Sequence, residues 1–376
     1  MWHDLTADQA LFRDTTARFL GERVPLARLR ENRNDPAGFD PGYWADGAAL
    51  GWTMPLVDEA DGGGSVSGRG TVDLALIAYE FGRHAAPGPL VDCNVVASAL
   101  SGQPGDLPRA VLDGLIAGTT IATACLGAAP WQEPDVTIRR DGDDFVIDGS
   151  VRPVEAAGQA AYLLVSGRSE SGGATQLLVP TGEAGVGIRA LKGLDVSRRF
   201  AAVTFDSVRA PAAALVGDHG RADDQIARQV RHAAVMLSAE SVGAMDAAFA
   251  MTLDWAFDRY AFGRALASYQ ALKHRFADMK SWLEASHAIS DAAADAVADD
   301  TPLAADTASA AKAYIGHHGP ELAQECVQMH GGIGVTYEHD LHFFLRRVTL
   351  NRLLYGTPAD HRRLLAAMQI GRETRA

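Results

Sequence analysis

Cysteine is scarce in this chain of 376 residues, in which only Cys93, Cys125 and Cys326 occur. The three cysteines are odd in number, lie far apart and show none of the close spacings by which cysteines bind a metal ion. Disulfides are rare in reducing compartments. We therefore expect three buried, unpaired thiols.

Basic residues and long apolar runs are also in short supply. Lys and Arg number 34 against 47 Asp and Glu, which gives a formal net charge of −13. This acidic balance excludes a general nucleic-acid-binding protein, although it leaves room for local phosphate sites. The first residues lack the apolar core of a signal peptide, and no run approaches the roughly 20 apolar residues of a membrane span. The prediction is a cytoplasmic protein with neither a nucleic-acid nor a membrane partner.

Apolar residues make up 47% of the chain, and their spacing changes twice along it. Residues 1–118 show mainly helical periodicity, with Thr6 and Thr71 as predicted N-caps and a glycine-rich loop over 58–70. Residues 119–221 hold six short β-branched runs, and a DGDD hairpin turn joins two of them. The runs are TIATACL, DVTIRR, DFVIDG, AAYLLVSG, TQLLVP and FAAVTFDSVR. Residues 222–376 return to long, alanine-rich helices. The pattern predicts an α+β protein with an N-terminal helical domain, a middle β-barrel or β-sandwich domain and a C-terminal helical bundle.

Two motifs in the last segment have the residue types of a ligand site. In "DRYAFGRALASYQALKHRFADM", one helix ends near Tyr260 and another begins after Ser268, with Arg259 and Arg264 beside the break. A helix N-terminus with arginines beside it is typical of a phosphate site, and the alternative is an ordinary turn with solvated arginines. "QMHGGIGVTY", residues 328–337, places three glycines between two helices at a cost of roughly 1 kcal/mol each. These glycines indicate either close approach of a ligand or a turn with positive φ.

Together these two motifs closely resemble the acyl-CoA dehydrogenase family of flavoproteins. The segments "LGW", "GGGS" and "DLALIAYEFGRHAAPGP" follow in family order, so the resemblance covers the whole chain. It implies an acyl-CoA dehydrogenase-like fold with a C-terminal four-helix bundle, an acyl-CoA substrate and FAD bound between the subunits of a tetramer. An acceptor of the electron-transfer flavoprotein type is a further implied partner.

The resemblance assigns six residues to the FAD that is held mainly by a neighbouring subunit. Arg259 and Phe262 correspond to contacts with the pyrophosphate, and Gln270 lies nearby. Gln328, Gly331 and Gly332 correspond to contacts with the adenosine end.

The family's flavin-ring motifs are not recognisable in the middle segment. The corresponding loop is "ACLGAAPWQEPDV" and the corresponding strand is "IDGSVRPVEAAGQAAYLLV", and neither keeps the family pattern. Trp131, Gln132 and Glu133 are candidates to substitute for the missing loop residues, but their spacing does not demand it.

The family's catalytic base is missing as well. When the sequence is aligned on Gly356 and Thr357, Tyr355 stands where most members have the glutamate. A phenol with an ordinary pKa of about 10 is a poor base for abstracting an α-proton. Some members place the glutamate on the long helix instead, at a position that falls here at Ala233. Glu240 is the nearest carboxylate, and it is either an alternative base or a carboxylate of the helix face.

Two groups of histidines raise the question of a metal site. His339 and His342 lie three residues apart with no third ligand in evident spacing, and His317 and His318 precede them. We therefore favour helix caps and polar contacts, and predict no metal. The stretch that contains His339 and His342 resembles the variant found in actinobacterial members that act on steroid side-chain CoA thioesters.

Three functional hypotheses follow. In the first, the chain is the subunit of an α₂β₂ acyl-CoA dehydrogenase that lacks its own base and completes the FAD site of a paralogous partner. In the second, it is a self-sufficient homo-oligomer with a non-standard base, or a desulfinase-like lyase. In the third, it is a flavin-free structural protein on the same fold.

Overall fold

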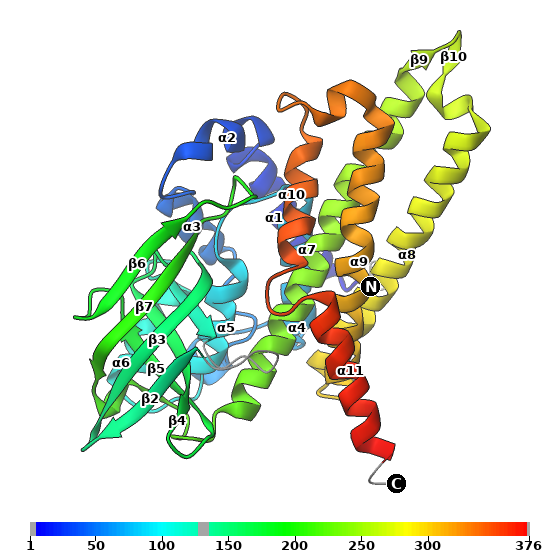
Figure 1. The fold of residues 1–376 in the computed structure, drawn as a ribbon. Helices are drawn as coiled ribbons and strands as arrows, with labels where there is room; N and C mark the ends of the chain where they lie inside the picture. Colours follow the sequence, from blue (N-terminus) through cyan, green and yellow to red (C-terminus); the bar gives the residue numbers. More distant parts are fainter. Residues whose placement is uncertain (1–4, 127–134, 374–376) are drawn as a thin grey trace. The chain divides into compact units, whose positions relative to one another are not determined.

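The computed structural model describes residues 5–126 and 135–373 (Figure 1). Helices fill the chain up to Ile116, strands follow from Ala122 to Val216, and helices return from Asp223, as the sequence predicts. The chain folds into two compact units, however, and their boundaries differ from those of the three predicted domains. One unit comprises residues 1–28, 71–86 and 234–376, and the other comprises residues 29–70 and 87–233. The domain boundaries at 118 and 221 therefore stay a prediction from the sequence.

The N-terminal third contains six helices among the described residues. They are α1 (Ala7–Arg23), α2 (Leu26–Glu31), α3 (Pro41–Ala49), α4 (Gly70–Arg83), α5 (Leu90–Leu100) and α6 (Asp106–Ile116). Thr6 caps α1 as predicted, in a reciprocal capping box with Gln9. Thr71 is not a cap, because α4 already begins at Gly70 and Thr71 is a buried residue of this helix. Gly70 lies against the backbone of Pro55, where a Cβ would meet the carbonyl oxygen at 1.8 Å.

The described residues of the β segment form one eight-stranded sheet. Its strands are β1 (Ala122–Leu126), β2 (Val136–Asp141), β3 (Asp144–Glu155), β4 (Tyr162–Ser169), β5 (Ala174–Pro180), β6 (Val186–Leu191), β7 (Phe200–Ala210) and β8 (Leu215–Val216). The order is β6-β7-β3-β2-β4-β5-β8, and β1 also pairs with β4. The pairs β1–β4 and β2–β4 are parallel, and the others are antiparallel.

The sequence predicts six of these strands and misses β6 and β8. Strand β6 lies at a sheet edge with most of its side chains at least partly exposed, so it lacks a strong apolar pattern, and β8 has only two residues. The predicted DGDD turn joins β2 to β3, with Gly142 at φ +67°. The core of the sheet is aliphatic, with Ile138, Ile147 and Val165 among its fully buried side chains.

The C-terminal part contains five helices among the described residues. They are α7 (Asp223–Asp258), α8 (Gln270–Ala298), α9 (Ala304–His330), α10 (Leu341–Asn351) and α11 (Pro358–Glu373), and α9 packs against α8, α10 and α11. By length and composition α7 passes as a membrane span, but 78% of its most apolar window is buried inside the protein. It is thus a core helix. Close backbone contacts at Gly82 of α4 and Gly243 of α7 bring these two helices together, because a Cβ at either residue would lie within about 2 Å of a carbonyl oxygen of the other helix.

The predicted break between α7 and α8 contains a short hairpin that the sequence did not predict. Its strands are β9 (Tyr260–Ala261) and β10 (Arg264–Ala265), followed by the 3₁₀ turn Leu266–Ser268. Figure 1 shows this hairpin at the end of the unit where α7 ends and α8 begins. At the corresponding end of α9, the glycine motif forms the 3₁₀ segment Gly331–Val335.

Candidate functional site

The structure brings the two C-terminal motifs to the same end of the helical unit (Figure 1). Arg259 follows the last residue of α7, Phe262 lies at the tip of the β9–β10 hairpin, and Gln270 is the first residue of α8. Gln328 lies in the last turn of α9, three residues before Gly331. All six predicted FAD residues are exposed to solvent in the chain, and their contact with FAD stays a prediction: Arg259, Phe262, Gln270, Gln328, Gly331 and Gly332.

Contacts within the chain fix the shape of the hairpin. The Tyr269 hydroxyl donates to the carbonyl of Ala261 at 2.7 Å. The Arg264 guanidinium lies 3.9 Å from the centre of the Tyr269 ring, and that of Arg259 lies 5.6 Å from the Trp255 ring. Neither arginine has a carboxylate partner in the part of the chain that the structure describes. A guanidinium near an aromatic ring, without a carboxylate partner, keeps N–H groups available for phosphate oxygens.

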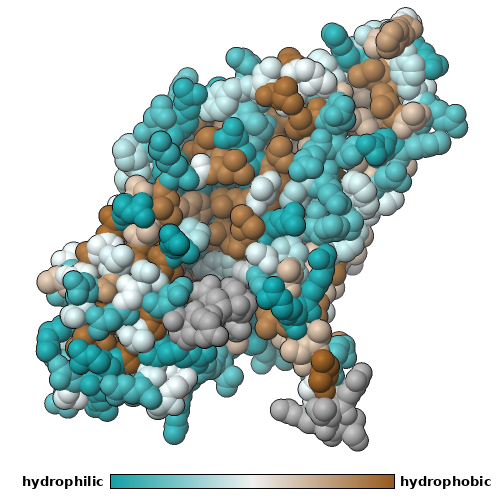
Figure 2. Space-filling model, in the orientation of Figure 1, coloured by the Kyte–Doolittle hydropathy of each residue, from teal (hydrophilic) through white to brown (hydrophobic). Residues whose placement is uncertain are grey.

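Apolar side chains are exposed at this end of the unit. Phe262 is 100% exposed, and its φ of +49° lies in the left-handed region that a bulky residue rarely adopts. Other large apolar side chains around the two motifs are also exposed: Phe257, Tyr260, Ile333 and Val335. Figure 2 shows brown residues at this tip. Exposed apolar groups that gather in one place are typical of a contact surface.

The three motif glycines have different reasons to be glycine. Gly331 has φ +64°, which agrees with the interpretation that this glycine permits a turn. At Gly334 a Cβ would lie 2.6 Å from the Val327 carbonyl oxygen, so packing within the chain excludes a side chain there. Gly332 has neither constraint, since no described atom comes within 4 Å of its Cβ position. Of the three, Gly332 is the one that fits close approach by a group from outside the chain.

Two side chains fix the segment at the expected position of the base by hydrogen bonds to its backbone carbonyls. Tyr355, with φ +53°, is half-buried, and its carbonyl accepts a hydrogen bond from His361 Nε2 at 3.0 Å. The buried Lys312 ammonium donates to the carbonyls of Asn351 at 2.5 Å and Gly356 at 3.2 Å. Burial lowers the pKa of Lys312 to about 7. Sequence analysis missed Lys312, because its place on α9 gives no sign that its side chain reaches this loop.

Glu240 forms a buried ion pair with Arg347. Its Oε1 accepts from the Arg347 guanidinium at 2.5 Å, and its Oε2 accepts from Asn351 Nδ2 at 2.8 Å. Arg347 is fully buried and also donates to the carbonyls of Ala85 and Ala86. These contacts join α7 to α10 and to the end of α4, which favours the structural interpretation of Glu240 over its role as a base.

A second buried ion pair lies on the strand that corresponds to the family's flavin-ring strand. Glu155, at the end of β3, accepts from Arg198 Nε at 2.5 Å, and both side chains are about 95% buried. The cavity beside them measures only about 10 Å³. Sequence analysis missed this pair, because 43 residues separate its members. The loop candidates Trp131, Gln132 and Glu133 lie outside the described residues.

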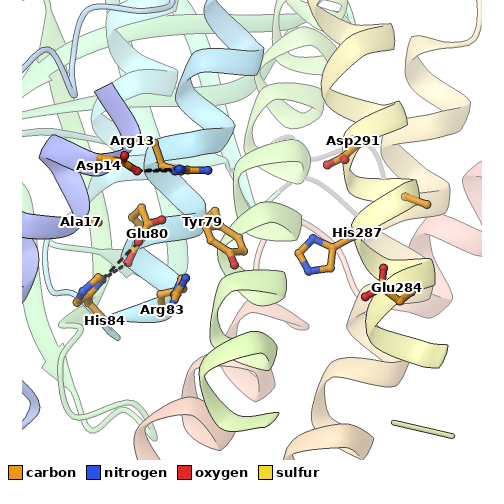
Figure 3. A pocket seen from close by; sticks show the side chains of 11 residues that line it. Arg13, Asp14, Ala17, Tyr79, Glu80, Arg83, His84, Glu284, His287 and Asp291 are labelled. Carbon is orange, nitrogen blue, oxygen red and sulfur yellow. Dashed lines mark hydrogen bonds and ion pairs between the residues drawn. The ribbon is translucent and has the colours of Figure 1, made fainter. Parts of the chain in front are cut away.

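The helical unit also contains a polar cavity of about 740 Å³ between α1, α4 and α8 (Figure 3). Its wall includes Tyr79, whose hydroxyl donates to Asp246 at 2.7 Å, and His287, whose Nε2 lies 2.8 Å from the same carboxylate. Burial opposes ionisation of Asp246, but these two hydrogen bonds hold its pKa below the usual range. Burial raises the pKa of Glu80, on the same wall, to about 7. The cavity contains none of the residues that the sequence predicts as functional.

His339 and His342 contact groups within the chain, and the absence of a metal from the histidine groups stays a prediction. The His339 ring lies 4.5 Å from that of His330, and His342 Nε2 lies 3.2 Å from the Tyr337 carbonyl oxygen. All three cysteines are buried and unpaired, as predicted.

Comparison with known proteins gives consistent matches along the chain. Residues 6–103 match the family described as "Acyl-CoA dehydrogenase, N-terminal domain", and residues 223–370 match "Acyl-CoA dehydrogenase, C-terminal domain". Acyl-CoA dehydrogenase IpdE2 of Mycobacterium tuberculosis is 26% identical over 355 residues, which cover 94% of each chain. Acyl-CoA dehydrogenase FadE12 of the same species is 29% identical and covers 82% of this chain and 83% of its own.

Solved structures share the fold over nearly the whole length. A variant of the Tcur3481–Tcur3483 steroid acyl-CoA dehydrogenase is 25% identical, with a TM-score of 0.87 and coverage of 98% of this chain and 99% of the other. Butyryl-CoA dehydrogenase from Megasphaera elsdenii superimposes with the same TM-score and coverage at 19% identity. The helical, β and helical order predicted from the sequence is therefore a known architecture.

Proposed function

The chain belongs to the acyl-CoA dehydrogenase family, and from this premise we propose that it is one subunit of a heteromeric acyl-CoA dehydrogenase. In this proposal a paralogous partner holds the flavin ring and the catalytic carboxylate. This chain completes the partner's FAD site with the residues at the hairpin end of its helical unit. The reaction is the α,β-dehydrogenation of an acyl-CoA thioester.

The exposed hairpin supports this proposal most directly. Phe262 adopts a left-handed conformation that costs about 1–2 kcal/mol for an L-residue. Its ring is fully exposed, so it contributes no buried surface to this chain's own fold. A strained, exposed aromatic beside two arginines without carboxylate partners in the described chain is suited to a ligand or protein that approaches from outside.

Each residue of this surface has a role that its chemistry supports. Arg259 and Arg264 would donate N–H groups to pyrophosphate oxygens, with Gln270 beside them at the start of α8. Gly332 would let the backbone approach a flat adenosine group, and Gln328 would hydrogen-bond to it. When bound, FAD supplies the hydride acceptor of the reaction.

The remainder of the chain supports the idea that it lacks an active site of its own. Tyr355 occupies the position of the family's glutamate, and both carboxylate oxygens of Glu240 accept hydrogen bonds from Arg347 and Asn351. On the strand that corresponds to the flavin-ring strand, the Glu155 carboxylate is engaged in a buried ion pair with Arg198.

For the substrate we propose a CoA thioester with a steroid side chain. Two observations support it. The segment "HGGIGVTYEHDLHFFLRR" resembles the variant of the family that acts on such thioesters. The steroid acyl-CoA dehydrogenase named above matches 98% of the chain. An electron-transfer flavoprotein-type acceptor would reoxidise the flavin of the complex.

Counting FAD in the purified complex tests the proposal. The chain is expressed alone and together with each paralogous dehydrogenase encoded near its gene. We expect no stable FAD in the chain alone and two FAD per four chains in the complex. One FAD per protomer and acyl-CoA-dependent reduction of an acceptor by the chain alone would establish the self-sufficient alternative. Absence of flavin from every combination would favour the structural-protein alternative.

Substitution in the complex assigns the site to this chain. Arg259→Ala should lower FAD occupancy, because it removes a guanidinium from the proposed pyrophosphate contact. Arg209→Ala, on the exposed face of β7, is the matched control and should leave occupancy unchanged. Equal occupancy in the two variants would contradict the proposed role of Arg259.

A further inference from the structure

Two histidines and a glutamate converge on one face of α9. His317 Nε2 lies 3.4 Å from Glu321 Oε1, and His318 Nδ1 lies 3.1 Å from Glu321 Oε2. One potential ligand atom from each of the three residues lies within 4.8 Å of the others. We propose that His317, His318 and Glu321 bind one divalent transition-metal ion of the zinc class.

The ligand types and their separations fit such an ion. Two imidazoles and a carboxylate are a common Zn²⁺ set, with bonds of about 2.0–2.2 Å. The ligands of a tetrahedral ion at that distance lie roughly 3.3 Å apart, which is close to the two histidine–carboxylate distances. The widest separation is larger, so one imidazole has to rotate on binding. His317 is 44% exposed and has room to do so.

Aromatic contacts orient the second histidine before any ion binds. The His318 ring stacks on Trp282 of α8 at 5.4 Å, with an interplanar angle of 24°, and lies 4.4 Å from the Tyr314 ring. These two contacts hold the ring beside Glu321, so that its Nδ1 lies 3.1 Å from the Glu321 carboxylate.

The open side of the cluster distinguishes it from a closed structural site. All three side chains come from a single helix and are partly exposed, so an ion held by them keeps at least one position for water or another ligand. Nitrogen ligands favour Zn²⁺, Co²⁺ or Ni²⁺ over Mg²⁺ or Ca²⁺. The cluster lies about two turns of α9 before Gln328, so the metal proposal is independent of the proposed FAD surface.

Titration of the full-length chain with Zn²⁺ tests this site. The protein carries no polyhistidine tag and is first treated with a chelator. Calorimetry should give one ion per chain, and Co²⁺ should produce the visible absorption of a low-coordinate complex. His318→Gln and Glu321→Gln should each weaken binding by about tenfold or more. Lowering the pH from about 8 to about 5 should also weaken it, because both imidazoles must be neutral.

A matched control separates this cluster from ordinary surface histidine. His274→Gln removes an exposed histidine of α8 and should leave the affinity unchanged. Circular dichroism confirms that each variant is folded, and Glu321→Gln keeps the size of the side chain. Absence of stoichiometric binding would overturn the proposal. So would an affinity that the His274 and His318 substitutions lower equally.

Discussion

Replacing Glu240 with alanine separates a structural from a catalytic role for this carboxylate. Glu240 is 5% exposed and Arg347 is 0% exposed, and the two form an ion pair with a distance of 2.5 Å. Removing one partner of a buried ion pair leaves the other charge uncompensated, which costs about 3–5 kcal/mol. For a unit of this size, that loss corresponds to a fall in Tm of roughly 10 °C. Replacing a base that played no part in packing would cause no such loss of stability.

The measurement is thermal unfolding of Glu240→Ala beside a matched control. Glu284→Ala removes an exposed carboxylate of α8 that pairs with Lys280, and it should change stability by less than about 0.5 kcal/mol. Arg347→Ala should destabilise about as much as Glu240→Ala, and the double variant should cost clearly less than the sum of the two. An unchanged Tm for Glu240→Ala, together with loss of dehydrogenase activity from the complex, would refute this reasoning and make Glu240 the base.

Three further predictions concern stability and exposure. Burial raises the pKa of Glu80 to about 7 from an ordinary 4.5, so the folded state binds this proton more tightly than the unfolded state does. The contribution of Glu80 to the free energy of unfolding is therefore greatest below about pH 4.5, and it falls by up to about 3 kcal/mol as the pH rises through 7. Glu80→Gln should flatten that part of the curve in urea unfolding, and an unchanged slope would contradict it. Gly334→Ala should destabilise the protein by about 1–3 kcal/mol in the same assay. Gly332→Ala should leave stability unchanged and lower FAD retention in the complex. A greater loss of stability from Gly332→Ala than from Gly334→Ala would exclude our account of the two glycines. The three thiols should not react with a thiol reagent before unfolding, because all are buried and burial raises each pKa, that of Cys326 to about 12; rapid labelling of the native chain would disprove this.

Local sequence signals predicted most of the elements. The Thr6 N-cap, the DGDD turn and the break before Gln270 depend on residues close together in the chain, and each is confirmed. The errors also have local causes. Thr71 satisfies the composition rule for an N-cap, but the preceding glycine fits against Pro55 and the helix starts there. Strand β6 lies at a sheet edge, where burial imposes little alternation on the sequence.

The sequence by itself determined the order of helical and β segments, the two motifs of the proposed FAD surface and the tyrosine at the glutamate position. Only the tertiary structure decided what the charged side chains contact. Glu240 and Arg347 are 107 residues apart, and the close crossing of α4 and α7 at Gly82 and Gly243 brings α4 near this pair. Lys312 reaches the Tyr355 loop across 39 residues or more. Such pairs depend on how distant helices pack, and periodicity within a single helix contains no record of that packing.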